Sequence, residues 1–251
     1  MENKLIVRLA TPDDKHYAET ITTEMEESAK ARGTGIAKRS PAYIEQKMEE
    51  GKAVIAITET GTWVGFCYIE AWQHEKYVAN SGLIVAPEFR KTGVATEIKR
   101  KVFALSREKY PNAKIFGLTT GLAVMKINSD LGYEPVTYGE LTTDEEFWKG
   151  CRSCVNYEIL MSKERKNCMC TAMLFDPEEA AEKQRQLAGL VVTPQGKLQQ
   201  DEKRRFQGNF KLFERWVRFK QFVLLKSFRK QETVNGVQVD KKKSLLGIFF
   251  W

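Results

Sequence analysis

The sequence predicts a protein of the α+β class, a mixed α/β fold in which the helices and the sheet follow a recognisable order. Segments with helical periodicity come first, three consecutive strand-like runs follow, and a strand–helix–strand pattern comes after them. The chain has 251 residues, of which 42% are hydrophobic and 29% charged, with 17 Gly and 7 Pro. This length suffices for a sizeable core, and the composition excludes collagen-like, low-complexity and coiled-coil proteins.

The first predicted elements are a short strand and two helices. The strand covers residues 5–9, and Thr11-Pro12-Asp13-Asp14 then supplies an N-cap and a first-turn proline for a helix that runs toward Lys30. The segment 32–35 contains two glycines and ends this helix. A second helix is predicted to begin at Ser40-Pro41 and to stop near Gly51.

The rest of the first part alternates strands and helices. Three strands are predicted at residues 53–58, 63–72 and 77–85, with a turn at residues 59–61 between the first two. A long helix, a strand, a helix and a last strand follow at residues 93–110, 114–118, 122–131 and 134–138. We therefore expect an antiparallel meander followed by a crossover connection.

Charge divides the chain into two parts. Residues 178–251 hold 16 Lys and Arg against 8 Asp and Glu, whereas residues 1–177 hold 24 against 25. All of the excess basicity of this +7 chain therefore lies in its last 74 residues. We expect a domain at residues 1–177 and a basic, helical C-terminal extension at residues 178–251 that meets an acidic partner or surface.

The extension carries aromatic and aliphatic side chains at helical spacing between residues 206 and 228, with lysines and arginines on much of the remaining surface. One explanation is a helix that lies on an anionic membrane surface. The favoured alternative is a helix packed on the first domain or on a second subunit, as in a homodimer. Contact with nucleic acid would be non-specific, so no specific nucleic acid is expected as a partner.

The segment from Leu83 to Ala95 predicts an anion site, because an apolar strand passes through a basic turn into a helix. Unpaired N–H groups at a helix N-terminus bind phosphate oxygens, and small residues such as Gly93 and Ala95 let these oxygens approach. The segment lacks the Gly-Lys-Ser/Thr ending of a nucleoside-triphosphate loop. A diphosphate is therefore the ligand that this turn fits best.

Arg90, Gly93 and Ala95 follow the spacing of a signature in which Arg or Gln is followed by Gly and then by Gly or Ala, after a Val-x-Pro. Downstream, the helix that ends in Leu131-Gly132-Tyr133 matches a second signature. With both at the proper separation, residues 3–175 resemble the GNAT family of N-acetyltransferases. The resemblance implies a central, mostly antiparallel twisted sheet flanked by helices, and transfer of an acyl group from acetyl-CoA or another acyl-CoA to an amine.

The family pattern also implies roles for residues around the donor. The strand at Leu83–Val85 would splay from the strand near residues 114–118, and the pantetheine arm would enter this gap. Val85 would pair with pantetheine through its backbone, and the Leu83 N–H would stabilise the thioester oxyanion. The pyrophosphate would be held by Arg90, Lys91, Thr92, Gly93, Val94 and Ala95.

Two positions depart from the family pattern. Asn128 stands where many members have a tyrosine that protonates the leaving thiolate, and Ala79 stands where many have a glutamate base. Candidates for the base are Glu70, His74 or a water held by Asn80, and we expect Glu70 to act. The alternative for Glu70 is a structural ion pair.

The acceptor is expected near the loop at residues 31–40, which contains Arg32, Lys38 and Arg39. Arginine guanidinium groups bind carboxylates, so this loop favours as acceptor a small amine that carries carboxylates. The alternative is a solvated basic loop without a ligand. The loop, the segment 117–121 and the cysteine-rich end are similar to a bacterial N-acylglutamate synthase group linked to arginine biosynthesis. That resemblance implies glutamate as acceptor and acetyl- or succinyl-CoA as donor. Separately, the N-terminal residues have no long apolar core and no apolar run reaches the length of a membrane helix, so we expect a cytoplasmic location without a signal peptide.

Four of the five cysteines lie close together in the sequence. Clustered cysteines in a cytosolic chain indicate thiols or a metal rather than disulfides. They form a Cys-x2-Cys and a Cys-x-Cys pair, which could hold a structural zinc ion as four thiolate ligands. Buried free thiols are the favoured alternative, with redox chemistry as a third. The four are Cys151, Cys154, Cys168 and Cys170.

Overall fold

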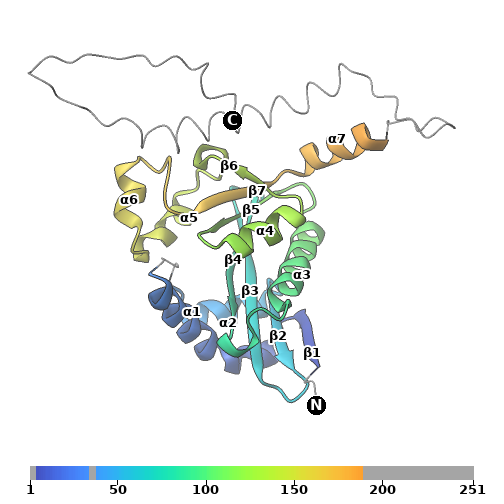
Figure 1. Cartoon of the computed structure of the whole chain (residues 1–251), viewed down its shortest axis with the longest axis vertical. Helices are drawn as coiled ribbons and strands as arrows, with labels where there is room; N and C mark the ends of the chain where they lie inside the picture. Colours follow the sequence, from blue (N-terminus) through green and yellow to red (C-terminus); the bar gives the residue numbers. More distant parts are fainter. Residues whose placement is uncertain (1–3, 34–37, 189–251) are drawn as a thin grey trace, which may run out of the picture. The chain divides into compact units, whose positions relative to one another are not determined.

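A computed structural model describes residues 4–33 and 38–188 of the chain (Figure 1). These residues form one seven-stranded sheet with the strand order β1-β2-β3-β4-β5-β7-β6. All neighbouring strands are antiparallel except β4 and β5, which are parallel. The strands are β1 (Leu5–Leu9), β2 (Ala53–Thr58), β3 (Trp63–Trp72), β4 (Tyr77–Val85), β5 (Lys114–Thr119), β6 (Glu134–Val136) and β7 (Thr171–Phe175).

The order of helices and strands confirms the predicted α+β class. The predicted bounds of β2, β3 and β4 agree with the structure at every residue. Long helix α3 links parallel strands β4 and β5, which is the expected crossover. The helices are α1 (Ala18–Arg32), α2 (Pro41–Glu49), α3 (Val94–Lys109), α4 (Leu122–Asp130), α5 (Glu145–Lys149), α6 (Tyr157–Ser162) and α7 (Pro177–Ala188), with short 3-10 helices at Pro12–Tyr17, Pro87–Phe89, Tyr138–Glu140 and Gly150–Ser153.

The first predicted helix differs from the structure at its start. Pro12–Tyr17 is a 3-10 helix, and the α-helix begins only at Ala18. Asp14 explains this beginning, since its carboxylate accepts hydrogen bonds from the Thr11 N–H at 2.8 Å and from both terminal nitrogens of Arg8 at 2.7 Å. The tight turn that results joins β1 to α1.

Strand β7 was not predicted, and it changes the order of the sheet. It lies between β5 and β6, so β6 pairs with β7 and not with β5. The predicted strand at residues 134–138 is shorter in the structure and passes into a 3-10 helix at Tyr138. The sequence at residues 171–175 is a short apolar run beside the cysteines, and it can only be assigned once its partner β5 is known.

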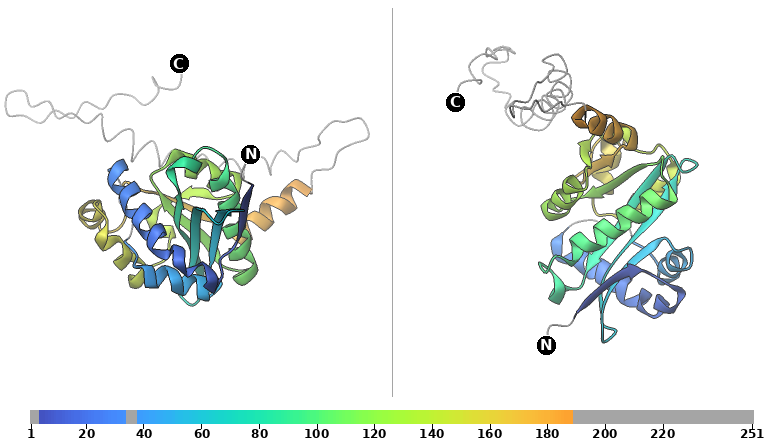
Figure 2. Two further views of the ribbon diagram at one scale, coloured as in Figure 1. Left: turned by 90° about the horizontal axis from the view of Figure 1, so that it is seen from below. Right: turned by 90° about the vertical axis from the view of Figure 1, so that its right-hand side faces the viewer.

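Helices cover both faces of the sheet (Figure 2). On one face, Val94, Ile98, Val102 and Leu105 of α3 pack with Val54, Val64 and Cys67 of β2 and β3. On the other face, α1 and α2 contribute Ile21, Met25, Ile44 and Met48, which pack with Ile55, Phe66 and Tyr68. Because side chains alternate along a strand, β3 and β4 supply residues to both faces.

The predicted extension is described only at its start, where α7 runs through residues 177–188. The expected basic helix between residues 206 and 228 lies outside the described residues. None of the described helices is long and apolar enough to cross a membrane.

Candidate active site

Strands β4 and β5 separate halfway along their length. Their pairs run from Tyr77↔Lys114 to Ala79↔Phe116, and no pair follows. Beyond this point β5 continues on β7 through Gly117, whereas β4 continues on β3 up to Val85. A gap between β4 and β5 therefore opens at Asn80 and extends toward the C-terminal end of β4.

A β-bulge lies in β4 at this gap. Ser81 pairs with Tyr68 and Ile84 with Phe66, so β4 has two residues, Gly82 and Leu83, opposite one residue of β3. Gly82 has a φ of +67°, and a Cβ there would lie 2.5 Å from the Tyr68 ring. A bulge frees one residue from the ladder and re-aims it. Leu83, the predicted oxyanion donor, is thus one of the two residues of the bulge.

The loop between β4 and α3 has the backbone shape of an anion cradle. Lys91 and Gly93 have φ values of +66° and +91°, and such left-handed residues in a turn make successive N–H groups converge. Gly93 is the N-cap of the 16-residue helix α3, whose first N–H groups have no partner within the helix. A Cβ on Gly93 would project into open space. The loop thus leaves room for a phosphate group at the positive end of the helix dipole.

Arg90 contributes to this loop through its main chain. Its guanidinium points to α1, where it contacts Glu24 at 2.7 Å and Ser28 at 2.6 Å, and its Nε donates to the Val85 carbonyl at 3.1 Å. The side chain therefore fixes the loop to α1 rather than lining the cradle. The open strand gap, the bulge and the cradle lie in succession along β4 and the start of α3.

A buried polar cluster closes the inner end of the gap, on the α3 face of the sheet. Asn80 is the first residue of β4 beyond the last β4–β5 pair, and its Nδ2 donates to Ser106 Oγ at 2.9 Å. Its Oδ1 accepts from Tyr133 Oη at 2.8 Å and from Lys99 Nζ at 3.2 Å. Lys99 is 2% exposed, and burial lowers its pKa. Lys99 and Tyr133 were not predicted, although a lysine at an apolar position of the α3 stripe is a signal that could have identified the former.

Asn128 lies beside this cluster on α4. A Cβ on Gly117 would be 3.6 Å from the Asn80 carbonyl and 3.9 Å from Asn128 Nδ2, so Gly117 separates the two asparagines. Asn128 is 1% exposed, and its Oδ1 is buried without a hydrogen-bond partner. Asn128, which stands where the family pattern has a tyrosine acid, therefore lies at the gap. Its side chain is an amide and cannot ionise.

A second cluster lies on the opposite face, formed by residues of α2, of β3 and of the segment that leads into α2. Arg39 donates from Nε to the Tyr68 hydroxyl at 3.0 Å, and the centre of its guanidinium lies 5.1 Å from the Tyr43 ring centroid. Tyr43 donates its hydroxyl proton to Glu70, whose other oxygen lies 2.9 Å from Lys47 Nζ. Burial raises the pKa of Tyr43, and Tyr68 and Glu70 raise it further, so this hydroxyl stays protonated.

This acceptor-side cluster adjoins the donor site. Tyr68 packs against Gly82 in the β4 bulge, and Glu70 is the cross-strand partner of Ala79, the position where related enzymes have their base. Within the described residues, Arg39 forms no ion pair with a carboxylate. The sequence predicted Arg39 and Glu70 but not Tyr43, Lys47 or Tyr68, which contact them only through the packing of α2 on the sheet.

The other predicted acceptor and base residues lie elsewhere. Lys38 bonds to Glu26 at 3.0 Å at the surface, and Arg32 ends α1. His74 is exposed in the turn before β4, at the end of that strand opposite to the phosphate loop. Of the two predicted cations whose side chains the structure describes, Lys38 and Arg39, only Arg39 lies in the cluster with Tyr43 and Glu70.

The four cysteines of the predicted zinc site lie near one another, and none of them forms a disulfide. Within the described residues, no group of three or more His, Cys, Asp or Glu is arranged as metal ligands, so the structure gives the zinc prediction no support. Burial and the neighbouring thiols raise the pKa of Cys151 to about 11 and that of Cys170 to about 12. Cys151, Cys168 and Cys170 pack against the core around Tyr138 and Trp148.

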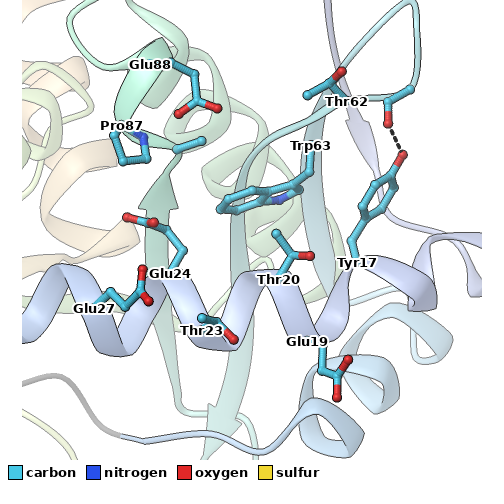
Figure 3. A pocket seen from close by; sticks show the side chains of 12 residues that line it. Tyr17, Glu19, Thr20, Thr23, Glu24, Glu27, Thr62, Trp63, Pro87 and Glu88 are labelled. Carbon is cyan, nitrogen blue, oxygen red and sulfur yellow. Dashed lines mark hydrogen bonds between the residues drawn. The ribbon is translucent and has the colours of Figure 1, made fainter.

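An acidic cavity of about 760 Å³ lies along α1 (Figure 3). Four carboxylates line it, together with Tyr17 and Trp63, and none of its lining residues is a lysine or arginine. Glu24, one of the four, is the residue that holds Arg90. The other three are Glu19, Glu27 and Glu88.

Comparisons with known proteins agree with this geometry. The acetyltransferase (GNAT) family model matches residues 22–123, which include the bulge and the phosphate loop. N-acetylglutamate synthase from Neisseria gonorrhoeae, solved with coenzyme A and N-acetyl-glutamate, has a TM-score of 0.50 and 15% identity over 70% of this chain and 36% of its own. The similarity thus spans little more than a third of that synthase. A search of curated protein sequences found no match.

Two further structures show similar values. A Mycobacterium tuberculosis protein in complex with CoA has a TM-score of 0.49 and 16% identity, over 68% of this chain and 98% of its own. Phosphinothricin acetyltransferase from Sinorhizobium meliloti, in complex with acetyl-CoA, has a TM-score of 0.47 and 16% identity, over 68% of this chain and 88% of its own. Residues 22–123, which include the splayed strands β4 and β5, thus match the acetyltransferase (GNAT) family.

Proposed function

We propose that the chain transfers an acetyl or succinyl group from acyl-CoA to the amine of an amino acid, with glutamate as the first acceptor to test. One observation carries the proposal. Arg39 is half-buried and donates to Tyr68, whose ring packs against the β4 bulge, and no carboxylate among the described residues forms an ion pair with it. A guanidinium in such a place favours a ligand that brings its own carboxylate, because a bidentate pair satisfies the fork.

The charges of the acceptor-side cluster suit a zwitterion. Tyr43 has the Arg39 guanidinium against its ring and the Glu70 carboxylate at its hydroxyl. An amino acid laid across Tyr43 would direct its carboxylate to Arg39 and its ammonium group to Glu70. This placement brings the amine close to Ala79 and the gap, where the donor would end.

The residues of this chain then have distinct tasks in the reaction. Bound acyl-CoA would supply the activated thioester. The main chain of residues 90–95 would hold its pyrophosphate, Val85 its pantetheine arm, and the Leu83 N–H would donate to the carbonyl oxygen as negative charge develops on it. Glu70 would draw the ammonium group and accept its proton, while Lys47 and Tyr43 keep the carboxylate oriented.

The identity of the acceptor has limited support from fold neighbours. The gonococcal synthase was solved with N-acetyl-glutamate, which is why glutamate comes first. On this proposal the reaction belongs to arginine biosynthesis and takes place in the cytoplasm, where amino acids and acyl-CoA are both present.

The test is a panel of amino acids, polyamines, aminoglycosides and peptides, each supplied with acetyl-CoA and with succinyl-CoA, in which CoA release is measured. Turnover on glutamate or another amino acid that is lost in Arg39→Ala supports the proposal. Turnover on polyamines or peptides alone contradicts it and leaves only the acyltransferase chemistry.

A cationic amine is the second candidate acceptor, and the acidic cavity favours it. Glu24 is paired with Arg90, but Glu19, Glu27 and Glu88 form no ion pair among the described residues and would attract a polyamine or a basic peptide. Glu27→Gln discriminates between the two candidates. It would raise the KM for a cationic acceptor and leave that for an amino acid unchanged.

A further inference from the structure

Lys99 is the least expected side chain of the donor site. It lies on α3 between Ile98 and the buried Val102, yet it is a lysine and 2% exposed. A buried ammonium normally has a carboxylate partner, because removing a charge from water is costly. Among the described residues, Lys99 pairs with no carboxylate.

Its surroundings satisfy the ammonium group only in part. One N–H reaches Asn80 Oδ1 at 3.2 Å, and Nζ lies 5.3 Å from the Tyr133 ring centroid. Asn80 Oδ1 is shared with the Tyr133 hydroxyl, and Asn80 Nδ2 is used by Ser106. An ammonium has three N–H donors, so Lys99 has donors to spare.

These spare donors lie where the strands separate. Asn80 is the first unpaired residue of β4 beside β5, and Gly117 opposite it has no side chain to fill the gap. Asn128, on the other side of Gly117, occupies the place of the missing acid and keeps an unpaired Oδ1. Within residues 4–33 and 38–188, the inner end of the gap therefore holds Lys99 with donors to spare and no carboxylate that pairs with it.

We infer that Lys99 is the acid that protonates the departing CoA thiolate. This inference rests on the proposed acyl transfer but not on the identity of the acceptor. A thiolate is an anion that exists there only after the acyl group has left, so Lys99 would gain its partner when negative charge develops.

The step balances as follows. The acceptor amine forms a bond to the thioester carbon, the carbon–sulfur bond breaks, and the electron pair stays on sulfur. Lys99 gives a proton to sulfur, which leaves as CoA thiol. The acceptor nitrogen loses two protons on passing from ammonium to amide; one restores Lys99 through solvent, and the other is released.

The titration of Lys99 is compatible with this role. Burial lowers its pKa, which makes it a stronger acid than an exposed lysine, while Cys67 on β3 raises it slightly. The other polar groups that face it are Asn80 of β4, Tyr133 after α4 and Ser106 of α3. None of these is an anion near neutral pH.

The experiment titrates the thiol of bound CoA by its ultraviolet thiolate absorbance, in the full chain and without any acceptor. A cation beside sulfur favours the thiolate. We expect the ionisation constant of the CoA thiol to be at least about tenfold larger when CoA is bound to the natural chain than when it is bound to Lys99→Met. Lys99→Arg should keep this difference, since arginine stays charged, but it should lower kcat because arginine gives up its proton reluctantly. Lys101→Met, at an exposed position of the same helix, is the matched control.

Equal ionisation of the bound thiol in the natural chain and in Lys99→Met, at equal CoA occupancy, would overturn the inference. Methionine is apolar and similar in length, so loss of folding is not expected; if it occurs, Lys99→Gln replaces it. A chain that binds no CoA would overturn this inference and the donor assignment together. A wrong acceptor would leave the thiol titration as expected and would show only in the panel.

Discussion

At the residue scale, the candidate site depends on how each charged side chain is partnered. Lys47 and Glu70 form an ion pair, whereas half-buried Arg39 and buried Lys99 form no ion pair with a carboxylate among the described residues. The two sit on opposite faces of the sheet, one beside the β4 bulge and one at the inner end of the gap. In this account each receives its anion only when substrate is bound or when the thioester breaks.

The first prediction concerns Arg39. Arg39→Ala should raise the KM for the amino-acid acceptor by about 10- to 100-fold, because hydrogen bonds to a charged group contribute about 1.5–3 kcal/mol. The KM for acyl-CoA and kcat should change little. Steady-state kinetics with both substrates varied measures this, and Arg152→Ala, at an exposed arginine, is the control. An unchanged acceptor KM in Arg39→Ala would remove Arg39 from the acceptor site.

The second prediction concerns the cysteines. Since burial raises the pKa of Cys151 to about 11 and that of Cys170 to about 12, both remain protonated near neutral pH. Alkylation by iodoacetamide should therefore be slow at neutral pH and accelerate as the pH rises toward these values. Mass spectrometry of the modified residues measures this. Co-purified zinc that is released on alkylation would contradict the free-thiol assignment.

At the element scale, β4 organises the site because it leaves β5, bulges at Gly82 and Leu83, and ends at the phosphate loop. The strand itself, the glycine-containing loop and the start of α3 could be predicted from the sequence. The bulge could not, since it depends on the register with β3. The cluster of Arg39, Tyr43 and Glu70 could not be predicted either, because it requires α2 to pack on a particular side of β3.

A third prediction tests the bulge. Gly82→Ala should lower the free energy of unfolding by about 2 kcal/mol or more, because the left-handed φ strains alanine and its Cβ would lie 2.5 Å from the Tyr68 ring. Gly117→Ala meets only ordinary contacts, at 3.6 Å and beyond, and should change stability by less than about 1 kcal/mol. Urea unfolding compares the two. Equal stability of both variants would refute the strained bulge.

A fourth prediction concerns the turn that starts the first helical segment. Burial opposes ionisation of Asp14, but hydrogen bonds from Arg8 and the Thr11 N–H prevail and lower its pKa. A lowered carboxyl pKa adds stability above the ordinary carboxyl pKa, and this stability is lost as the pH falls through the folded-state value. Asp14→Asn should therefore cost about 1–3 kcal/mol at neutral pH.

The cost should shrink only as the pH falls from the ordinary carboxyl pKa through the lowered folded-state pKa of Asp14, where the natural chain also loses its charge at this position. Unfolding curves at neutral pH and across this acidic range measure the difference, with exposed Asp13→Asn as control. A cost that does not depend on pH would contradict the charged role of Asp14.

At the scale of the whole molecule, charge is distributed unevenly along the chain. Residues 1–177 are nearly neutral, whereas residues 178–251 are basic. Strand β7, which follows the cysteines, pairs with β5 and so belongs to the same sheet as the rest of the domain. We propose that the extension meets an anionic membrane surface, the domain or a second subunit. Flotation with anionic liposomes, with and without residues 190–251, discriminates among these, since membrane contact should be salt-sensitive and lost on deletion.

The most direct test of the central claim is calorimetric titration of the chain with acetyl-CoA, because the donor cradle at the start of α3 underlies every later step. The natural chain should bind acetyl-CoA, and Gly93→Glu should abolish binding by adding bulk and negative charge where the phosphate lies, while thermal unfolding shows a folded protein. Gly33→Glu, which also has a positive φ and open space, should bind as the natural chain does. Undiminished acetyl-CoA affinity in folded Gly93→Glu would contradict the assignment of this loop as the donor site.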